Sequence, residues 1–189
     1  MATILGIDPG LTRLGVGVIE AGPGRQVSLI HVDVYRTSPD LEVSARLGSL
    51  GGEVARLLDR YVPDLLALER VFAQHNVRTV MGTAQVSGVV LALAHQRSIP
   101  VSLRTPSEVK AAVTGHGRAD KAQVGRMVQS ILGLDEVPKP ADAADALALA
   151  ITEAWRGLGV AAPGGNQETP AQRAWREGER NARRPKLQR

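Results

Sequence analysis

The sequence contains no cysteine, so disulfide bonds, thiolate metal sites and a cysteine nucleophile are all excluded. No apolar run approaches the ~20 residues that a membrane-spanning helix needs. The first residues, MATILGID, lack the basic segment and the long apolar segment of a signal peptide. We therefore expect a soluble protein of the cytoplasm that has no membrane partner.

Basic residues outnumber acidic ones only slightly, and the excess lies near the carboxyl terminus. The net charge is +4 and the pI is about 10.0, which suggests an acidic partner such as nucleic acid. Residues 159–189 hold 7 of the 23 lysines and arginines but 3 of the 19 acids, so the preceding part has 16 of each. Charge alone is therefore weak evidence for nucleic-acid binding. We expect one domain over 1–158 and a flexible basic tail over 159–189.

Hydrophobic periodicity predicts a mixed α/β fold. Three strands joined by short Gly and Pro turns open the chain, and such close spacing implies antiparallel neighbours. Ser38 before Pro39 is typical of a helix N-terminus, so we expect the first helix to begin there and to end near Tyr61. Helices and buried strands then alternate. The expected strands are 3–8, 14–20, 27–35, 64–70 and 99–103, and the expected helices are 39–61, 77–96, 141–155 and two that open with the capping-box patterns TPSE and ADKAQ.

Four acidic residues stand where a sheet-end site would need them. Asp8 and Glu69 each follow an apolar strand, and the carboxyl ends of neighbouring strands are where α/β sheets bind ligands. Asp142 and Asp145 are three residues apart and share one helix face. If these carboxylates converge, they need a compensating charge, which Mg²⁺ or Mn²⁺ supplies. Two such ions suit in-line attack on a phosphodiester.

Each acidic residue also has a plainer interpretation. Asp8 before Pro9-Gly10 is typical of a turn. Asp142 and Asp145 fit the first turn of a helix, where the dipole favours acids. Glu69 is harder to explain this way, because a charge that ends a buried strand needs a partner.

Two lysines complete the candidate site. Lys121 lies in the first turn of a predicted helix, where the dipole disfavours a cation, and a local rule broken in this way often marks function. Lys110 follows the TPSE helix start. Near a metal site either lysine could hold the scissile phosphate, and otherwise both are solvated surface residues.

Four motifs carry a resemblance to a known family. They are LGIDPG at 5–10, LALERVF at 66–72, GHGRADK at 115–121 and ADAADALALAI at 141–151. With these motifs in this order, the stretch from Ala2 to Ile151 resembles the RuvC family of Holliday-junction resolvases. The resemblance implies an RNase H-like α/β fold: a five-stranded mixed sheet, its first three strands antiparallel, flanked by helices. The tail from Gly159 lies outside the resemblance.

The resemblance also implies an activity and its residues. It identifies Asp8, Glu69, Asp142 and Asp145 as catalytic carboxylates that hold two Mg²⁺ or Mn²⁺ ions, with Lys121 as a catalytic lysine. It makes Lys110 a phosphate contact and Phe72 an aromatic that stacks on a base of the DNA. The implied partners are four-way junction DNA, a second copy in a two-fold homodimer and the RuvA-RuvB branch-migration complex. Paired symmetric nicks in opposed strands then resolve the junction.

Three other functions stay open at this point. DPGLT at 8–12 also fits the D-x-G-x-T phosphate loop of actin and sugar-kinase ATPases, although that family needs two such domains around its nucleotide. A protein that binds junction DNA without cutting it is a second alternative. A different RNase H-like nuclease, with another nucleic-acid substrate, is a third.

Overall fold

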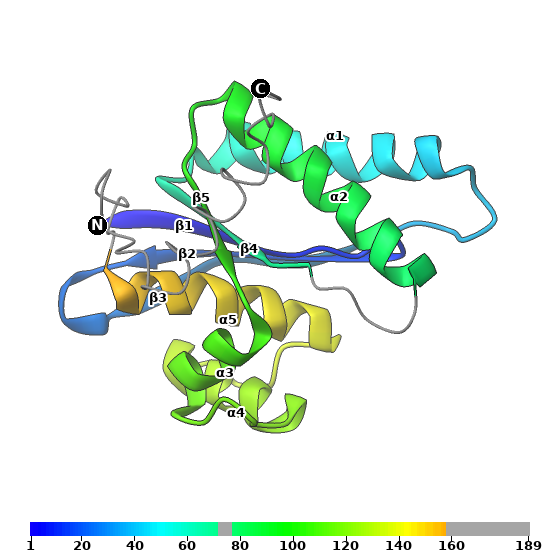
Figure 1. Ribbon diagram of the computed structural model, residues 1–189. Helices are drawn as coiled ribbons and strands as arrows, with labels where there is room; N and C mark the ends of the chain where they lie inside the picture. The colour runs from blue at the N-terminus through cyan, green and yellow to red at the C-terminus, as the bar shows by residue number, and fades with distance from the viewer. Residues whose placement is uncertain (72–76, 158–189) are drawn as a thin grey trace, which may run out of the picture. The chain divides into compact units, whose positions relative to one another are not determined.

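The computed structural model describes residues 1–71 and 77–157, and for 77 and 78 it describes the backbone alone. One layer of helices lies on each face of a single sheet (Figure 1). The elements are β1 (Ala2–Asp8), β2 (Arg13–Ala21), η1 (Pro23–Arg25), β3 (Val27–Arg36), α1 (Val43–Tyr61), β4 (Leu65–Glu69), α2 (Val77–Gln96), β5 (Val101–Arg104), α3 (Pro106–Thr114), α4 (Lys121–Leu132) and α5 (Ala141–Arg156). Among the described helices, none is long and apolar enough to cross a membrane.

The five strands form one mixed sheet in the order β3-β2-β1-β4-β5. β1 pairs antiparallel with β2, and β2 pairs antiparallel with β3. β1 pairs in parallel with β4, which pairs in parallel with β5. The five-stranded mixed sheet with three antiparallel leading strands is therefore confirmed. Its parallel part brings the carboxyl ends of β1 and β4 to the same edge.

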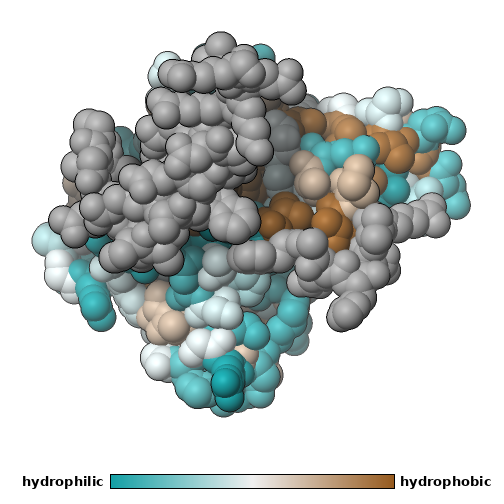
Figure 2. All heavy atoms as spheres, in the orientation of Figure 1, coloured by the Kyte–Doolittle hydropathy of each residue, from teal (hydrophilic) through white to brown (hydrophobic). Residues whose placement is uncertain are grey.

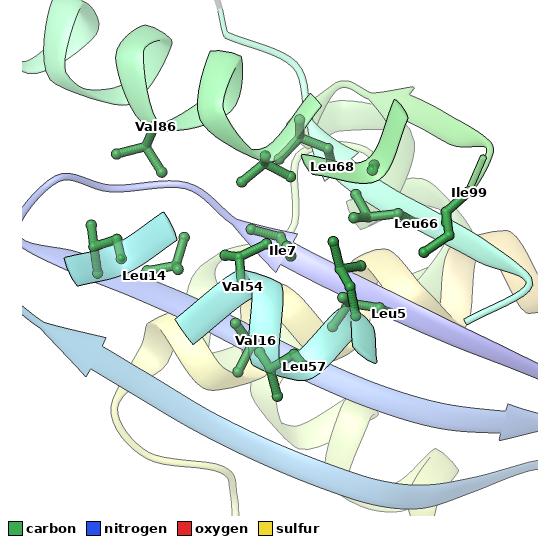
Figure 3. Packing of buried hydrophobic residues seen from close by; sticks show 14 of the residues in the cluster. Leu5, Ile7, Leu14, Val16, Val54, Leu57, Leu66, Leu68, Val86 and Ile99 are labelled. Carbon is green, nitrogen blue, oxygen red and sulfur yellow. The ribbon is translucent and has the colours of Figure 1, made fainter. Parts of the chain in front are cut away.

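Each face of the sheet packs against its own helical layer. α1 and α2 cover one face, while α5, with α3 and α4 beyond it, covers the other (Figure 1). Because side chains alternate along a strand, Leu5 and Ile7 of β1 point to the α1–α2 face and Ile4 to the α5 face. Figure 3 shows the core on the α1–α2 face, where Leu5, Ile7 and Leu14 of the sheet meet the helices. The two cores hold the edge that carries Asp8 and Glu69 rigidly.

The first helix begins later than its sequence predicts. α1 starts at Val43, with Glu42 at its N-cap position, and not after Ser38. The Ser38 hydroxyl oxygen accepts a hydrogen bond from the Asp40 backbone N–H, and the Leu41 N–H bonds to the Ser38 carbonyl. A serine hydroxyl that bonds two residues ahead closes a local turn, which competes with helix initiation. The prediction of a helix from 39 was therefore wrong by one turn.

Glycines let α5 lie directly on the backbone of β1 and β2. A Cβ added at Gly6 would stand 2.0 Å from the Ala146 carbonyl oxygen, and one at Gly15 would stand 2.1 Å from the Asp142 carbonyl oxygen. A side chain at either position would push the helix off the sheet. The helix contributes its own small residues to this contact, with Ala146 and Ala150 fully buried. This close approach decides how near the first turn of α5 comes to the end of β1.

A buried ion pair holds the other end of α5. Glu153 is 3% exposed, and its carboxylate accepts hydrogen bonds from Arg104 of β5. The Ser102 hydroxyl also donates to Glu153 at 3.1 Å. The carboxylate in turn raises the pKa of the Arg104 guanidinium further above its ordinary value. The pair therefore ties the last turns of α5 to β5.

Replacing Glu153 by glutamine is expected to destabilise the protein by about 3 kcal/mol, because the change removes the nearer charged partner of the partly buried Arg104 and leaves only Glu108, 3.9 Å away. Urea unfolding followed by circular dichroism measures the loss. Asp59→Asn is the matched control, since it breaks the exposed Asp59–Arg97 pair and should leave the midpoint nearly unchanged. Equal midpoints for Glu153→Gln and the wild type would show that the buried pair does not stabilise α5.

Candidate active site at the ends of β1 and β4

Asp8 and Glu69 lie side by side at the edge of the sheet. Ile7 of β1 is in register with Leu68 of β4, and the two acids are the next residues along these parallel strands. Both side chains are half-buried. A turn-forming aspartate would face solvent, whereas the Asp8 carboxyl is largely removed from water. The placement inferred from the strand ends is therefore what the structure has.

Asp142 and Asp145 reach the same edge from the first two turns of α5. The Asp142 carbonyl lies against Gly15, and Gly15 is the cross-strand partner of Asp8. The helix thus delivers Asp142 next to the end of β1 through a backbone contact. Asp145, one turn further, lies on the same helix face. All four predicted acids are gathered at one end of the sheet.

Two basic side chains form ion pairs with the two α5 carboxylates. The Lys121 Nζ lies 2.9 Å from Asp145 Oδ2, and the Arg13 Nε lies 3.0 Å from Asp142 Oδ2. Lys121 is the first residue of α4, which a capping box between Asp120 and Gln123 starts at this point. The lysine that breaks the helix-dipole rule therefore faces an acid from another helix. The ion pair with Asp145 supplies a negative partner for Lys121 that the sequence did not reveal.

Sequence reasoning missed Arg13. A signal was available, because the hairpin register that pairs Asp8 with Gly15 puts the first residues of β2 just beyond the end of β1. Arg13 is exposed except for its contact with Asp142. It therefore neutralises one acid of the cluster and leaves its stem in solvent.

Burial and neighbouring acids raise the pKa values of Asp8 and Glu69. The pKa of Asp8 rises to about 8, first because burial disfavours the charged form and then because Glu69, Asp145 and Asp142 repel it. Lys121 opposes this rise. Burial and Asp145 also raise the pKa of Glu69. The hydrogen bond to Asp145 raises the pKa of Lys121, so this lysine stays protonated at neutral pH.

The donor set fits a hard divalent cation. All four side chains supply carboxylate oxygens, which Mg²⁺ and Mn²⁺ prefer, and the charges of Glu69, Asp145 and Asp142 add to the effect of burial in raising the Asp8 pKa. In the described part of the chain, no three acidic or histidine side chains stand close enough together to form a ready cation site. Two of the four acids are engaged by Arg13 and Lys121 instead. A cation would therefore compete with these side chains for the same oxygens.

The two remaining predicted residues have different outcomes. Lys110 lies in α3, which the Thr105–Glu108 capping box starts, and its charge lowers the raised pKa of Glu69. It therefore stands within electrostatic reach of the acids. Phe72 lies outside the described residues, so its base-stacking role stays a prediction.

A hollow of about 650 Å³ opens beside the acids. The loop from Asp8 to Arg13 forms one wall, and Asp142 borders it. Thr79, Gly82 and Thr83 of α2 and Arg46 of α1 line the opposite side. The site therefore continues past the carboxylates toward the α1–α2 layer.

The chain is similar to proteins of one family in both its sequence and its structure. The family model described as crossover junction endodeoxyribonuclease RuvC matches residues 4–153. The chain is 56% identical over 194 residues to the crossover junction endodeoxyribonuclease RuvC of Leifsonia xyli subsp. xyli, covering 96% of this chain and 93% of that protein. It is 63% identical over 153 residues to that of Streptomyces griseus subsp. griseus, covering 81% and 75%. T. thermophilus RuvC in complex with a Holliday junction substrate superposes with a TM-score of 0.79 at 37% identity, covering 82% and 94%.

Proposed function

This chain belongs to the family of RuvC crossover junction endodeoxyribonucleases, and from that membership we propose how its residues cut a Holliday junction. It is a structure-selective endonuclease of DNA recombination and repair that resolves four-way junctions. The observation that carries this function is the family match over residues 4–153, within which all four acids gather at one sheet edge. Membership in a nuclease family decides against the ATPase interpretation of DPGLT.

Enzymes of this family depend on a metal ion. The proposed ligands here are Asp8, Glu69, Asp142 and Asp145, and the proposed metal is Mg²⁺ or Mn²⁺, with two ions per site. When bound, such ions activate a water molecule and stabilise the leaving oxygen of a phosphodiester. The oxygen-only ligands, and the three acids whose charges act on Asp8, support this assignment.

Lys121 and Arg13 neutralise the acids before a cation does. If Asp145 served as a metal ligand, the Lys121 ammonium that now pairs with it would be free to face the substrate phosphate. There it would stabilise the negative charge that develops on the phosphate. Lys110, whose charge acts on Glu69, is the second proposed phosphate contact. Phe72 remains the proposed base-stacking residue.

Cleavage of a labelled four-way junction beside a linear duplex tests the function. We expect paired symmetric nicks on the junction with Mg²⁺ or Mn²⁺, and none with chelator. Binding without nicks in either metal would identify a protein that recognises junctions but does not cut them. Equal cutting of the linear duplex would contradict the selectivity for junctions, while phosphodiester cleavage would still stand.

Two matched nicks need two sites related by symmetry, so we propose a two-fold homodimer. We propose α2 as the dimer surface, because its outer side carries Met81 at 55% and Leu91 at 38% exposure. Figure 2 shows apolar surface over the part of the molecule where α1 and α2 lie in Figure 1. A second copy would remove this surface from water.

Leu91→Glu is expected to dissociate the dimer, because it places a charge on the proposed apolar contact. Sedimentation equilibrium should give half the wild-type mass, with an unchanged circular dichroism spectrum. Met127→Glu is the matched control, since Met127 on α4 has the same 38% exposure and lies outside the proposed contact. A Leu91→Glu protein that keeps the dimer mass would remove α2 as the interface.

Three further proposals concern the location of the enzyme, its partner complex and its domain limits. We propose that the enzyme acts on DNA in the cytoplasm, with the RuvA-RuvB branch-migration complex as its partner at the junction. The compact unit that ends at Leu158 supports a nuclease domain over 1–158, with 159–189 as a separate basic tail.

A further inference from the structure

Arg46 is a buried cation that the proposed chemistry does not use. It lies in α1 on the hollow beside the active site and is 7% exposed. Its Nε donates to the Thr37 hydroxyl and its Nη2 to the Thr12 hydroxyl, both at 2.9 Å. No carboxylate in the described part of the chain forms an ion pair with it. A guanidinium keeps its charge at any ordinary pH, so a positive charge is buried here without a negative partner.

The two hydrogen bonds alone do not explain an arginine. They join the loop after β1 to the connection between β3 and α1, where the Thr37 N–H also bonds to the Thr12 carbonyl at 3.1 Å. A neutral glutamine amide has two N–H donors and could serve two hydroxyl acceptors. A charged donor strengthens each of these bonds, but it also costs desolvation that a neutral amide would avoid. An anion in the hollow would repay that cost.

The hollow has the donors that an anion needs. The Thr12 oxygen accepts from Arg46, so its own hydrogen is available to donate into the hollow. Arg13, the other guanidinium on the wall, already has Asp142 as its partner. Arg46 and Thr12 therefore form a small donor cradle on the α1–α2 side of the acids. Lys121 and Lys110 stand on the α3–α4 side.

We propose that Arg46 and Thr12 form a second phosphate subsite, which binds a backbone phosphate of the DNA strand next to the one that is cut. This inference rests on the proposed function, because the anion it names is a phosphodiester of the substrate. The cleaved strand is then held from both sides: by the lysines on the α5 face of the sheet, and by Arg46 on the α1 face. Such a contact positions the strand over the carboxylates without touching the reacting atoms.

The salt dependence of junction binding distinguishes this role from a tether. Each phosphate neutralised by a side chain contributes a slope of about −0.9 to the plot of log affinity against log salt. Full-length wild type, Arg46→Gln, Arg46→Lys and Arg60→Gln would be titrated with junction in chelator over a range of NaCl. We expect Arg46→Gln to bind about ten-fold more weakly with a slope shallower by about 0.9 per protomer, and Arg46→Lys to keep the wild-type slope. Arg60 is an exposed arginine of the same helix, and its variant should keep both values.

A second pair of variants covers the case in which Arg46→Gln does not fold. Thr83 lines the hollow from α2, and Thr83→Glu adds a negative charge to it without removing a buried partner. We expect junction binding by Thr83→Glu to be about ten-fold weaker than by Thr83→Gln. Equal binding by these two, a wild-type slope for Arg46→Gln, or the same loss of slope for Arg60→Gln would each overturn the subsite. Wild-type cleavage is scored separately, so the subsite can fail while the resolvase function stands.

Discussion

Asp8→Asn is expected to abolish junction cleavage and to make the metal-free protein more stable at pH 8. The loss should be about a thousand-fold or more, since one ligand of the proposed cations is gone and about 4 kcal/mol of transition-state stabilisation goes with it. The gain in stability follows from the pKa of Asp8, which burial and three neighbouring acids raise to about 8. A loss of activity combined with a gain in stability is typical of a residue that activity requires but that destabilises the folded protein.

The metal-free wild type loses stability as the pH rises, because Asp8 titrates at a higher pH in the folded protein than in the unfolded chain. Between pH 3.8 and about 8 the folded protein keeps a proton on Asp8 that the unfolded chain releases. The stability that Asp8 contributes is therefore fully present below pH 3.8 and is lost as the pH rises through about 8. Within that window the free energy of unfolding falls by up to about 1.4 kcal/mol per pH unit from this group. Asparagine does not titrate, so the variant lacks this decline.

Urea unfolding in chelator at pH 5 and pH 8 measures the effect. The variant should gain most over the wild type at pH 8 and much less at pH 5. Added Mg²⁺ should then stabilise the wild type more than the variant, because a ligand that binds only the folded state raises its stability. A variant that is less stable than the wild type at pH 8, or one that still cuts junctions, would contradict the assignment.

Gly15→Ala is expected to reduce cleavage about a hundred-fold or more without removing any catalytic side chain. Its new Cβ would stand 2.1 Å from the Asp142 carbonyl oxygen, and real contacts of this kind essentially never fall below 3.0 Å. The first turn of α5 must therefore shift, and it carries Asp142 and Asp145 with it. A displacement of about 1 Å at reacting groups is enough for a loss of that size. Overpacking should also cost about 1–3 kcal/mol of stability.

Gly48→Ala is the control for this prediction. Gly48 is an exposed glycine within α1, and a Cβ added there meets nothing within 4 Å. Alanine favours the helix by about 0.5–1 kcal/mol, so this variant should be slightly more stable and fully active. Single-turnover cleavage rates and urea midpoints of the two variants would be compared. A Gly15→Ala enzyme with the wild-type rate would show that the helix–sheet contact does not set the position of the acids.

Local interactions explain which parts of the fold were predictable. The capping boxes at Thr105–Glu108 and Asp120–Gln123 lie where their short sequence patterns predict them, because each needs only residues three apart. The exception is also local: the Ser38 turn competes with the helix start that Pro39 suggested. Serine before proline fits both structures. The contacts around Ser38 decided between them.

The sequence by itself determined that Asp8 and Glu69 each end a buried strand and that Asp142 and Asp145 share a helix face. Those facts depend on periods of two and of 3.6 residues, which the chain carries in its order of residues. The tertiary structure alone decided that Arg13 forms an ion pair with Asp142 and that the pKa of Asp8 rises to about 8. It also decided that Arg46 is buried without an acidic ion-pair partner among the described residues. Ion pairing and burial depend on which distant segments meet in space. Arg46 meets Thr12 across 34 positions of the chain only because α1 folds back over the end of β1.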